Sequence, residues 1–158
     1  MKRRATLGGG INKWEVCRML AERGNFDLFL PAGRYTLPEQ KAFDTFLPLC
    51  ESRGFDTFTS GPQNSGLLAT GARPGAFYDY DVASRDIIDR VNTIEAICRD
   101  HCVRMIDAAF KFPLLHLAHV SVIPGGSSGF ADKCSSTGVL YEAAFCWCMT
   151  HAKPVSHA

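Results

Sequence analysis

The sequence predicts an α/β fold with four parallel strands and intervening helices, as in part of a (β/α)8 barrel. Short apolar runs alternate with segments whose apolar residues recur at helical spacing, and such alternation favours right-handed βαβ units. Polar segments rich in glycine and serine follow the last two predicted strands, at Gly61–Gly66 and Pro124–Ser128, where barrels commonly bind phosphate. A doubly wound sheet also fits the alternation. However, Gly8-Gly9-Gly10 is not followed by the further glycine of the dinucleotide-binding turn.

The first unit begins with a predicted strand over Ala5–Ile11. Asn12 is the expected N-cap of the next helix, because Asn is a preferred residue at that position. The helix covers Lys13–Arg23 and ends at Gly24. Its apolar residues at helical spacing are Trp14, Cys17 and Leu20.

The second unit has a predicted strand over Phe26–Leu30. Thr36 and Glu39 have the spacing of a capping box, which predicts a helix start. Gly54 is expected to end this helix. Its inward face is predicted from the i, i+3, i+4, i+7 pattern of Phe43, Phe46, Leu47 and Cys50.

The third predicted strand, Phe55–Thr59, leads into Ser60–Gly71, around which the chain is organised. Gly61 and Gly66 allow a backbone to approach a ligand, and the polar residues between them supply donors and acceptors, as an anion-binding concavity requires. A plain surface turn is the alternative, because these residue types dominate ordinary loops. The loop Ala72–Ala83 has no periodicity and is long enough to be functional.

The last part of the chain predicts two helices and a strand. Ser84 can cap a helix that ends near Cys102. A further helix begins at about Val103, and Pro113 marks a kink or its end. The final strand is predicted over Val120–Ile123. The apolar residues of the two helices are Ile87, Val91, Ile94 and Cys98, and then Ile106, Ala109 and Phe110.

The composition describes one globular domain. The chain has 158 residues, 46% hydrophobic and 21% charged, with a formal net charge of +1, which suits a soluble chain with a single core. Nucleic acid and anionic membranes are not expected as partners, because both attract a basic surface that this sequence lacks. No stretch approaches the length of an apolar membrane span.

The cysteines indicate a reducing compartment. Seven cysteines are present, an odd number, and most fall inside apolar helical patterns. No signal peptide precedes them. A cytoplasmic location is therefore expected.

Several segments, taken together, resemble the aldo-keto reductases. The resemblance covers about residues 5–129, in the same order and at compatible spacings, and it is strongest to the sugar-oxidising branch of that family. The segments that carry it are Gly10–Cys17, Ala32–Leu37, Gly61–Gly71, Phe112–Leu114 and Ser121–Gly125.

The resemblance implies an eight-stranded barrel that binds NAD or NADP in an extended pose. This chain would be the C-terminal half of that barrel, strands five to eight, over residues 1–129. The family's catalytic Asp, Tyr, Lys and His belong to the first four strands, so no catalytic residue is assigned here. Tyr35, Lys111 and His116 have suitable side chains but are expected to be structural.

The resemblance also implies cofactor contacts at three places. Asn12 matches the family's Asn that hydrogen-bonds the nicotinamide carboxamide, a role compatible with helix capping. The loop over the pyrophosphate is matched by Gly61, Pro62, Gln63, Asn64, Ser65, Gly66 and Leu67. The last strand exit, which cradles the adenosine ribose, is matched by Ile123, Pro124, Gly125, Gly126, Ser127 and Ser128.

The sequence departs from the family pattern in three ways. Ala32 stands where the family usually has Gln, and Ser60 stands where an aromatic residue usually stacks on the nicotinamide. Residues 130–158 do not match and are interpreted as a divergent or out-of-frame tail. A zinc site in this tail is conceivable, but its spacing is shorter than structural zinc sites use, so no metal site is assigned. The residues considered for it are Cys146, Cys148 and His151.

Two functional hypotheses follow. In the first, the chain is the cofactor-side half of an NAD(P)-dependent oxidoreductase that oxidises an aldose or a related aldehyde or alcohol by hydride transfer, and it is inactive alone. In the second, it is a non-catalytic dinucleotide-binding or half-barrel assembly module. A half-barrel exposes two strand edges and an apolar inner face, so a homodimer, a complementary half-barrel or aggregation is expected. The alternative to association is a monomer whose open face is covered by the tail from Cys134 onward.

Overall fold

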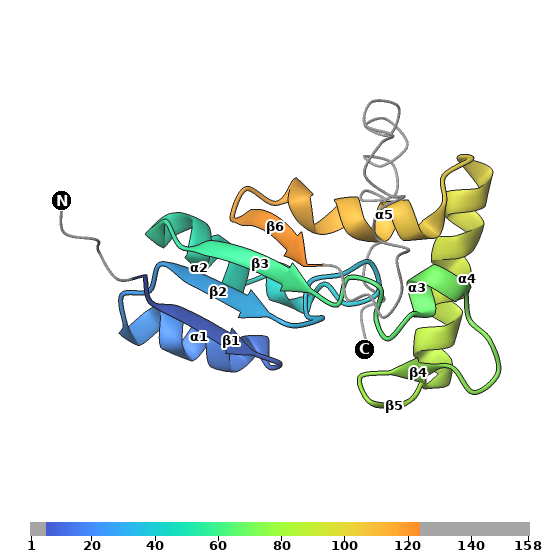
Figure 1. Ribbon diagram of the computed structural model, residues 1–158, viewed down its shortest axis with the longest axis horizontal. Coiled ribbons are helices and arrows are strands. Elements are labelled where there is room, and N and C mark those ends of the chain that lie inside the picture. The colour runs from blue at the N-terminus through green and yellow to red at the C-terminus, as the bar shows by residue number, and fades with distance from the viewer. Residues whose placement is uncertain (1–5, 124–158) are drawn as a thin grey trace.

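A four-stranded sheet forms the centre of the computed structural model, which describes residues 6–123. The strands run in the order β1-β2-β3-β6, and each neighbouring pair is parallel (Figure 1). The prediction of an α/β fold with four parallel strands is confirmed. The strands are β1 (Gly8–Ile11), β2 (Leu28–Pro31), β3 (Asp56–Ser60) and β6 (His119–Ile123).

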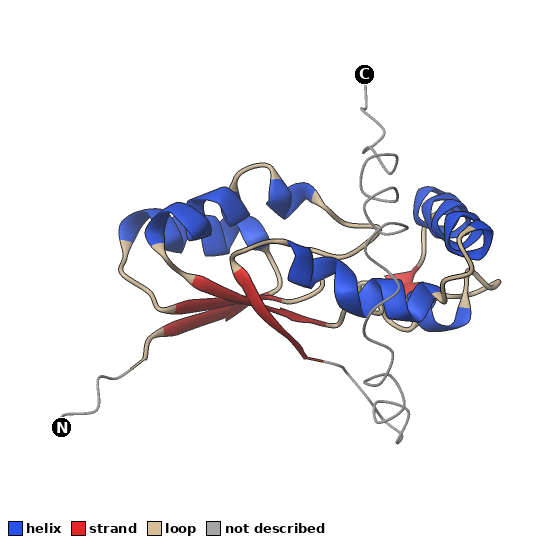
Figure 2. Ribbon diagram, turned by 90° about the horizontal axis from the view of Figure 1, so that it is seen from above, coloured by secondary structure: helices blue, strands red, loops and turns tan. Residues whose placement is uncertain are grey.

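Helices cover one face of this sheet. α1 (Trp14–Arg23) contacts β1 and β2, and α2 (Phe46–Arg53) contacts β3. Figure 2 shows α1 and α2 on the same side of the sheet, and none of the helices described in residues 6–123 lies on the opposite side. Two further helices, α4 (Arg85–Asp100) and α5 (Met105–Lys111), pack against each other, with α4 beyond the carboxyl ends of the strands (Figure 1).

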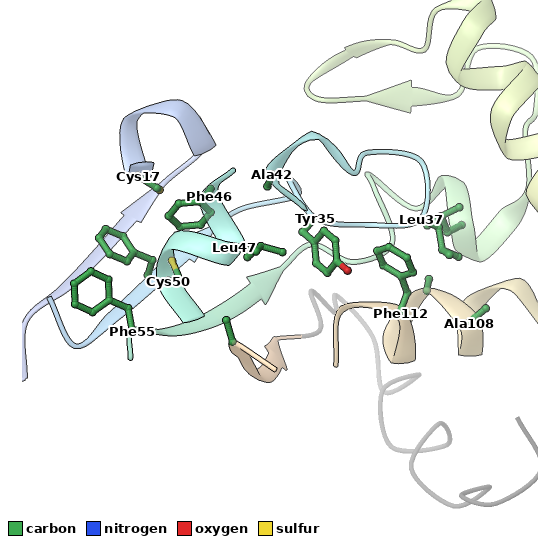
Figure 3. Close-up of a cluster of buried hydrophobic side chains, with 14 of the residues drawn as sticks. Cys17, Tyr35, Leu37, Ala42, Phe46, Leu47, Cys50, Phe55, Ala108 and Phe112 are labelled. Atoms are coloured by element: carbon green, nitrogen blue, oxygen red, sulfur yellow. The ribbon is translucent and has the colours of Figure 1, made fainter. Parts of the chain in front are cut away.

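Buried aromatic side chains fill the space between the sheet and these helices. Phe29 of β2 is fully buried, and its ring centroid lies 4.8 Å from that of Phe26, 5.7 Å from Phe46 and 5.9 Å from Phe55. Figure 3 shows the same cluster continuing toward Phe112. Because burial of apolar area is the main favourable contribution to folding, this cluster fixes which face the helices cover.

Side chains alternate between the two faces of the sheet. Thr57 and Thr59 are fully buried, and Phe58 between them is half-buried. Leu28 and Leu30 of β2 are half-buried in the same way. Successive strand residues point to opposite faces, so the sheet has a covered face beneath the helices and an open face that carries Leu28, Leu30 and Phe58.

The strand positions were predicted well. β2, β3 and β6 begin and end within two residues of their predicted ranges. β1 is shorter than predicted and begins at Gly8. β6 contains an irregularity, because its register with β3 shifts between Thr57 and Phe58.

The prediction that Asn12 caps α1 is wrong. Lys13 is the N-cap, in an extended conformation, and its side chain makes no capping hydrogen bond. The first intrahelical bonds go to the Lys13 carbonyl, whereas the Asn12 carbonyl accepts a hydrogen bond from the Arg34 guanidinium. Gly24 ends the helix as predicted, and its N–H donates to the carbonyl of Leu20 at 2.9 Å.

The capping-box prediction for the second helix is also wrong. Thr36 and Glu39 form a turn closed by two reciprocal backbone hydrogen bonds of 2.8 and 3.1 Å, and α2 begins later. Pro48 explains the later start, because proline has no N–H and is accepted only in the first turn of a helix. The predicted inward residue Phe43 is 46% exposed, in the 3₁₀ turn η1 (Lys41–Phe43). Gly54 ends α2 as predicted, with a left-handed φ of 66°.

The loop Ala72–Ala83 contains a hairpin that the sequence did not predict. β4 (Phe77–Tyr78) pairs with β5 (Asp81–Val82) in an antiparallel arrangement. Asp79 and Tyr80 form its turn with φ values of 51° and 70°. Two-residue hairpin turns of this kind usually use Asn-Gly or Asp-Gly, and that signal is missing here.

The last two helices agree with the predictions. Ser84 caps α4, because its Oγ accepts a hydrogen bond from the Ile87 N–H at 3.4 Å. Val91 and Cys98 are buried. The α5 helix ends before Pro113, and the chain continues in the 3₁₀ turn η2 (Phe112–Leu115).

Candidate cofactor-binding site

The carboxyl ends of the parallel strands lie along one edge of the sheet (Figure 1). Backbone hydrogen bonds join neighbouring exits. The Ala32 N–H donates to the Ile11 carbonyl at 3.3 Å, and the Gly33 N–H donates to the Ser60 carbonyl at 2.9 Å. Ligands of parallel α/β sheets bind outside this edge, so a ligand site is expected at these exits.

The loop Gly61–Leu67 follows β3 at this edge and has an unusual backbone. Four of its residues have left-handed φ values, 64° at Gly61, 48° at Asn64, 58° at Ser65 and 89° at Gly66. Residues other than glycine seldom adopt this region, although Asn does so more readily than most. Such turns form concave surfaces of backbone N–H groups that bind anions.

Several backbone N–H groups of this loop make no hydrogen bond to the described residues. Three internal hydrogen bonds of 3.0–3.1 Å close it, donated by the N–H groups of Asn64, Leu67 and Leu68. Among the N–H groups of this loop, those of Gly61, Gln63, Ser65 and Gly66 donate no hydrogen bond to the residues that the structure describes. These donors are available to an anionic ligand.

Asn64 adds a side-chain group to the same loop. It is 7% exposed, and its Oδ1 is buried without a hydrogen-bond partner among the described residues. A buried polar group without a partner is destabilising, and the Asn amide can both donate and accept. A ligand group that donates a hydrogen bond to Oδ1, such as a hydroxyl or an amide N–H, would remove that penalty, whereas phosphate oxygens are matched by the backbone N–H groups.

The space beside the loop is open. A Cβ added at Gly61 or at Gly66 would meet no atom within 4 Å. The backbone can therefore be approached closely by a ligand, and the available N–H groups suit a phosphate or pyrophosphate. The residues present fit the phosphate portion of a dinucleotide.

A short helix anchors the loop, and the sequence analysis missed it. α3 (Leu67–Thr70) begins at the end of the loop, and Leu67 and Leu68 are 2% and 1% exposed. The signal was the Leu-Leu pair before Gly71, which is too short to show helical periodicity. Burial of these two side chains holds the loop against the core.

Asn12 lies at the exit of β1, next to the β2 exit. It is exposed, and its side chain makes no hydrogen bond to the residues that the structure describes. Because it does not cap α1, its amide is available to a ligand. The neighbouring exits carry Ala32 and Ser60, whose small side chains supply neither an amide nor an aromatic ring.

The third predicted contact region is only partly visible. Ile123 ends β6, is paired in register with Ser60, and is 43% exposed. Pro124–Ser128 lie outside the described residues. The cysteines and histidine considered for zinc lie there too, and residues 6–123 contain no cluster of three or more side chains suited to a metal ion.

The three residues whose side chains could serve in acid-base catalysis, Tyr35, Lys111 and His116, lie in the core or at its margin. Tyr35 is 1% exposed, its ring centroid is 4.8 Å from that of Phe112, and burial raises its pKa to about 12. His116 is half-buried, and burial lowers its pKa. Lys111 ends α5. Within residues 6–123 no helix is both long and apolar enough to cross a membrane.

Comparison with known proteins gives relatives in sequence and in structure. The chain is 38% identical over 119 residues to pyridoxal 4-dehydrogenase of Microbacterium luteolum, covering 75% of this chain and 35% of the relative. It is 41% identical over 123 residues to D-threo-aldose 1-dehydrogenase of a Pseudomonas species, covering 77% and 37%. The chain thus spans about a third of the length of these curated relatives. No family model matches the sequence.

The fold is that of half a known barrel. The aldo-keto reductase AKR11C1 of Bacillus halodurans in its apo form superposes with a TM-score of 0.67 at 18% identity, over 94% of this chain and 51% of that one. Its holo form gives a TM-score of 0.64, over 90% and 49%. The fold class is therefore about half of an aldo-keto reductase (β/α)8 barrel. With the sequence relatives, this places the chain in the aldo-keto reductase family.

Proposed function

We propose that this chain is the cofactor-side half of an NAD(P)-dependent aldo-keto reductase. The observation that carries the proposal is the loop Gly61–Leu67, with four available backbone N–H groups at the carboxyl edge of a parallel sheet. Concave loops of this kind bind phosphate, and a dinucleotide pyrophosphate matches their donors. The same loop also carries the family resemblance in the sequence.

The chain's own residues would bind and orient the cofactor. The loop would hold the pyrophosphate, Asn12 would hydrogen-bond the nicotinamide carboxamide, and the segment from Ile123 to Ser128 would lie along the adenosine ribose. A bound nicotinamide supplies hydride transfer. The proposed substrate is an aldose or a related aldehyde or alcohol, which the names of the two sequence relatives support.

The proposed half lacks a group for proton transfer. Oxidation of a hydroxyl needs a base within hydrogen-bond reach of its proton, and no residue of this chain matches the family's catalytic set. We therefore expect the purified chain to form no NADH or NADPH from an aldose or pyridoxal. Steady turnover by the isolated chain would contradict this prediction.

Cofactor binding can be tested at the loop with a matched control. Gly61→Val should weaken NAD and NADP binding at least about tenfold, because a branched side chain at a left-handed φ blocks the backbone approach. Gly75→Val is the control, since Gly75 also has a left-handed φ, of 76°, and open space around it, but lies outside the loop. Calorimetric titration of the three proteins gives the comparison.

The control separates local strain from a lost contact. Gly75→Val should bind as the wild type does. If all three proteins bind NAD(P) equally, Gly61–Leu67 is an ordinary turn. If none binds, the cofactor proposal itself is wrong.

A second candidate function, half-barrel assembly, is favoured by the shape of the sheet. Within the described residues β1 pairs only with β2, and β6 pairs only with β3, so two strand edges are open. The apolar side chains Val120 and Ile123 of β6 are 50% and 43% exposed. A second copy or a complementary half-barrel would pair these edges and cover the open face.

Association can be measured directly. Light scattering during size-exclusion chromatography should give a mass above the 17.3 kDa of one chain. Phe58→Asp, on the open face, should shift the protein toward one chain per particle because it places a charge in the interface. A well-behaved monomer of the unchanged protein would rule out the assembly candidate, and its collapse after removal of residues 134–158 would indicate that the tail covers the open face.

A further inference from the structure

One guanidinium joins three segments at the carboxyl edge of the sheet. Arg34 follows β2, and its side chain is 18% exposed. Its Nη2 donates to both carboxylate oxygens of Asp79, at 2.8 and 2.7 Å. Its Nε donates to the backbone carbonyl of Asn12. The β1 exit and the β4–β5 hairpin are thereby tied to the same side chain.

The hairpin end of this arrangement is a strained turn. Asp79 and Tyr80 are non-glycine residues with left-handed φ values of 51° and 70°. Such a conformation persists when surrounding contacts determine it. The contacts here are the short β4–β5 ladder, the Ala83 N–H bond to the Ala76 carbonyl at 2.8 Å, and the Arg34–Asp79 ion pair.

The guanidinium is committed to these partners. Burial works against its charge, but the hydrogen bond and negative charge of Asp79 outweigh burial, so the pKa of Arg34 is raised. The neighbouring Tyr78 hydroxyl is buried, and burial raises its pKa to about 12, so it is neutral at physiological pH. Arg34 therefore stays cationic, and its Nε and Nη2 groups donate to the Asn12 carbonyl and to the Asp79 carboxylate.

The bond from Arg34 to the Asn12 carbonyl affects the orientation of the proposed nicotinamide-binding amide. Asn12 is exposed and its backbone is not fixed as a helix cap, because Lys13 takes that position. The bond from Arg34 holds the Asn12 carbonyl at the exit of β1, one peptide beyond the Ile11 carbonyl that the Ala32 N–H holds. The direction in which the Asn12 amide points depends on that peptide.

We propose that Arg34 is a positioning residue: anchored by Asp79, it holds the Asn12 backbone so that the Asn12 amide meets the nicotinamide end of the cofactor. This inference rests on the proposed function. It assigns to the Arg34–Asp79 pair the recognition of nicotinamide and leaves the pyrophosphate to the loop Gly61–Leu67. Arg34 itself does not contact the cofactor.

Two ligands distinguish this role from a general structural one. NAD contains the nicotinamide, and ADP-ribose contains the same adenosine and pyrophosphate without it. Arg34→Lys and Asp79→Asn should each weaken NAD binding about tenfold and leave ADP-ribose binding within about twofold, as expected for loss of one positioned contact. Arg18→Lys is the control, because Arg18 makes an exposed ion pair of 2.8 Å with Glu22 on α1, away from this edge.

A double-mutant cycle sharpens the test. Asn12→Ala should weaken NAD binding to the same extent as Arg34→Lys, and the double variant should lose little more, because both changes remove one contact. Thermal unfolding of each variant shows that it is folded. Additive losses would overturn the proposal.

The other outcomes also decide. Equal losses for NAD and ADP-ribose would show that Arg34 supports the site as a whole or binds the pyrophosphate, and the proposal fails. Tighter binding of both ligands by Asp79→Asn would show that the guanidinium is an anion ligand blocked by Asp79, which also overturns it. Unchanged NAD binding overturns it directly. If the wild type binds neither ligand, the proposed function is wrong and this inference falls with it.

Discussion

The two faces of the sheet differ in how their side chains are supported. On the covered face, Phe29 contacts three other aromatic rings and is fully buried. On the open face, Leu28, Leu30 and Phe58 are apolar but only half-buried. The covered face therefore supplies most of the packing energy of the chain alone, and the open face is apolar surface whose burial depends on other parts of the protein.

Glycine strengthens this contrast at β1. Gly8 lies on the open face, since a Cβ there would meet the Leu28 side chain, whereas a Cβ at Gly9 would meet Phe29 on the covered face. Alternation places Gly10 on the open face with Gly8. This end of the open face is thus a bare backbone, on which a neighbouring element can lie close.

The largest expected effect is on the covered face. Phe29→Ala should lower the free energy of unfolding by about 3–5 kcal/mol, because it removes a buried ring and leaves a cavity. Phe58→Ala is the matched change on the open face, and it should cost about 1 kcal/mol in the monomer. Urea unfolding of both variants tests the contrast. Equal losses would mean that the open face is packed as tightly as the covered one.

Protonation of His119, which is buried on the covered face, should also lower the stability of the folded chain. His119 is 6% exposed, and its Nδ1 is 2.7 Å from the Thr57 Oγ1. The Thr57 hydroxyl donates to the Ala118 carbonyl at 2.8 Å, so it accepts from Nδ1–H. Nε2 is buried and has no partner in the described part of the chain. Burial, and secondarily the charge of His116, lower the pKa of His119 from 6.5 to about 3.

This shift has a definite sign for stability. Below pH 6.5 the unfolded chain takes up a proton at His119, and the folded chain does not until about pH 3. The free energy of unfolding therefore carries no penalty from His119 above pH 6.5, and the penalty grows as the pH drops from 6.5 toward 3. Between pH 7 and pH 4 the loss should be roughly 2–4 kcal/mol, at about 1.4 kcal/mol per pKa unit.

Comparison with His119→Gln isolates this contribution from those of the carboxylates. Urea midpoints of both proteins should be measured from pH 7 to pH 4. The wild type should lose stability more steeply than the variant. Parallel curves would show that His119 is protonated as readily in the folded chain as in the unfolded one.

The smallest expected effect is on the open face at β1. Gly8→Ala should cost about 1 kcal/mol, because its Cβ would stand 2.8 Å from a Leu28 methyl that must move. Gly10→Ala is the control, since its Cβ would meet nothing within 4 Å, and it should be neutral or slightly stabilising. If Gly10→Ala instead reduces association in light scattering, another element lies against this strand.

Capping residues in the sequence predicted a helix boundary correctly where contacts within one turn of the helix determine that boundary. Gly54 and Ser84 act within one turn of their helices, and both predictions are confirmed. The prediction that Asn12 caps α1 is wrong, because Arg34, which is distant in the sequence, binds the Asn12 carbonyl. Thr36 failed as a helix start because Pro48 delays the helix, a constraint that acts from beyond the predicted box.

The candidate site was predicted in part. The loop Gly61–Leu67 could be proposed from its residue types, because glycine and polar residues after a strand suit an anion-binding turn, although the same residues are common in ordinary loops. Its buried Asn64 and its anchor in α3 could not, since they depend on how the loop packs. The roles of these residues in cofactor binding stay predictions, and so do those of Pro124–Ser128, which lie outside the described residues.

The sequence by itself determined the order of the four sheet strands and of the helices α1, α2, α4 and α5, the parallel α/β class and the polar loop after β3. Periodicity and turn residues encode these features within a few neighbouring positions. Only the tertiary structure decided which face of the sheet is covered, that a hairpin forms at Asp79 and Tyr80, and that Arg34 joins this hairpin to Asn12. These features depend on contacts between residues distant in the sequence, and a pattern of residue types does not specify which distant residues will meet.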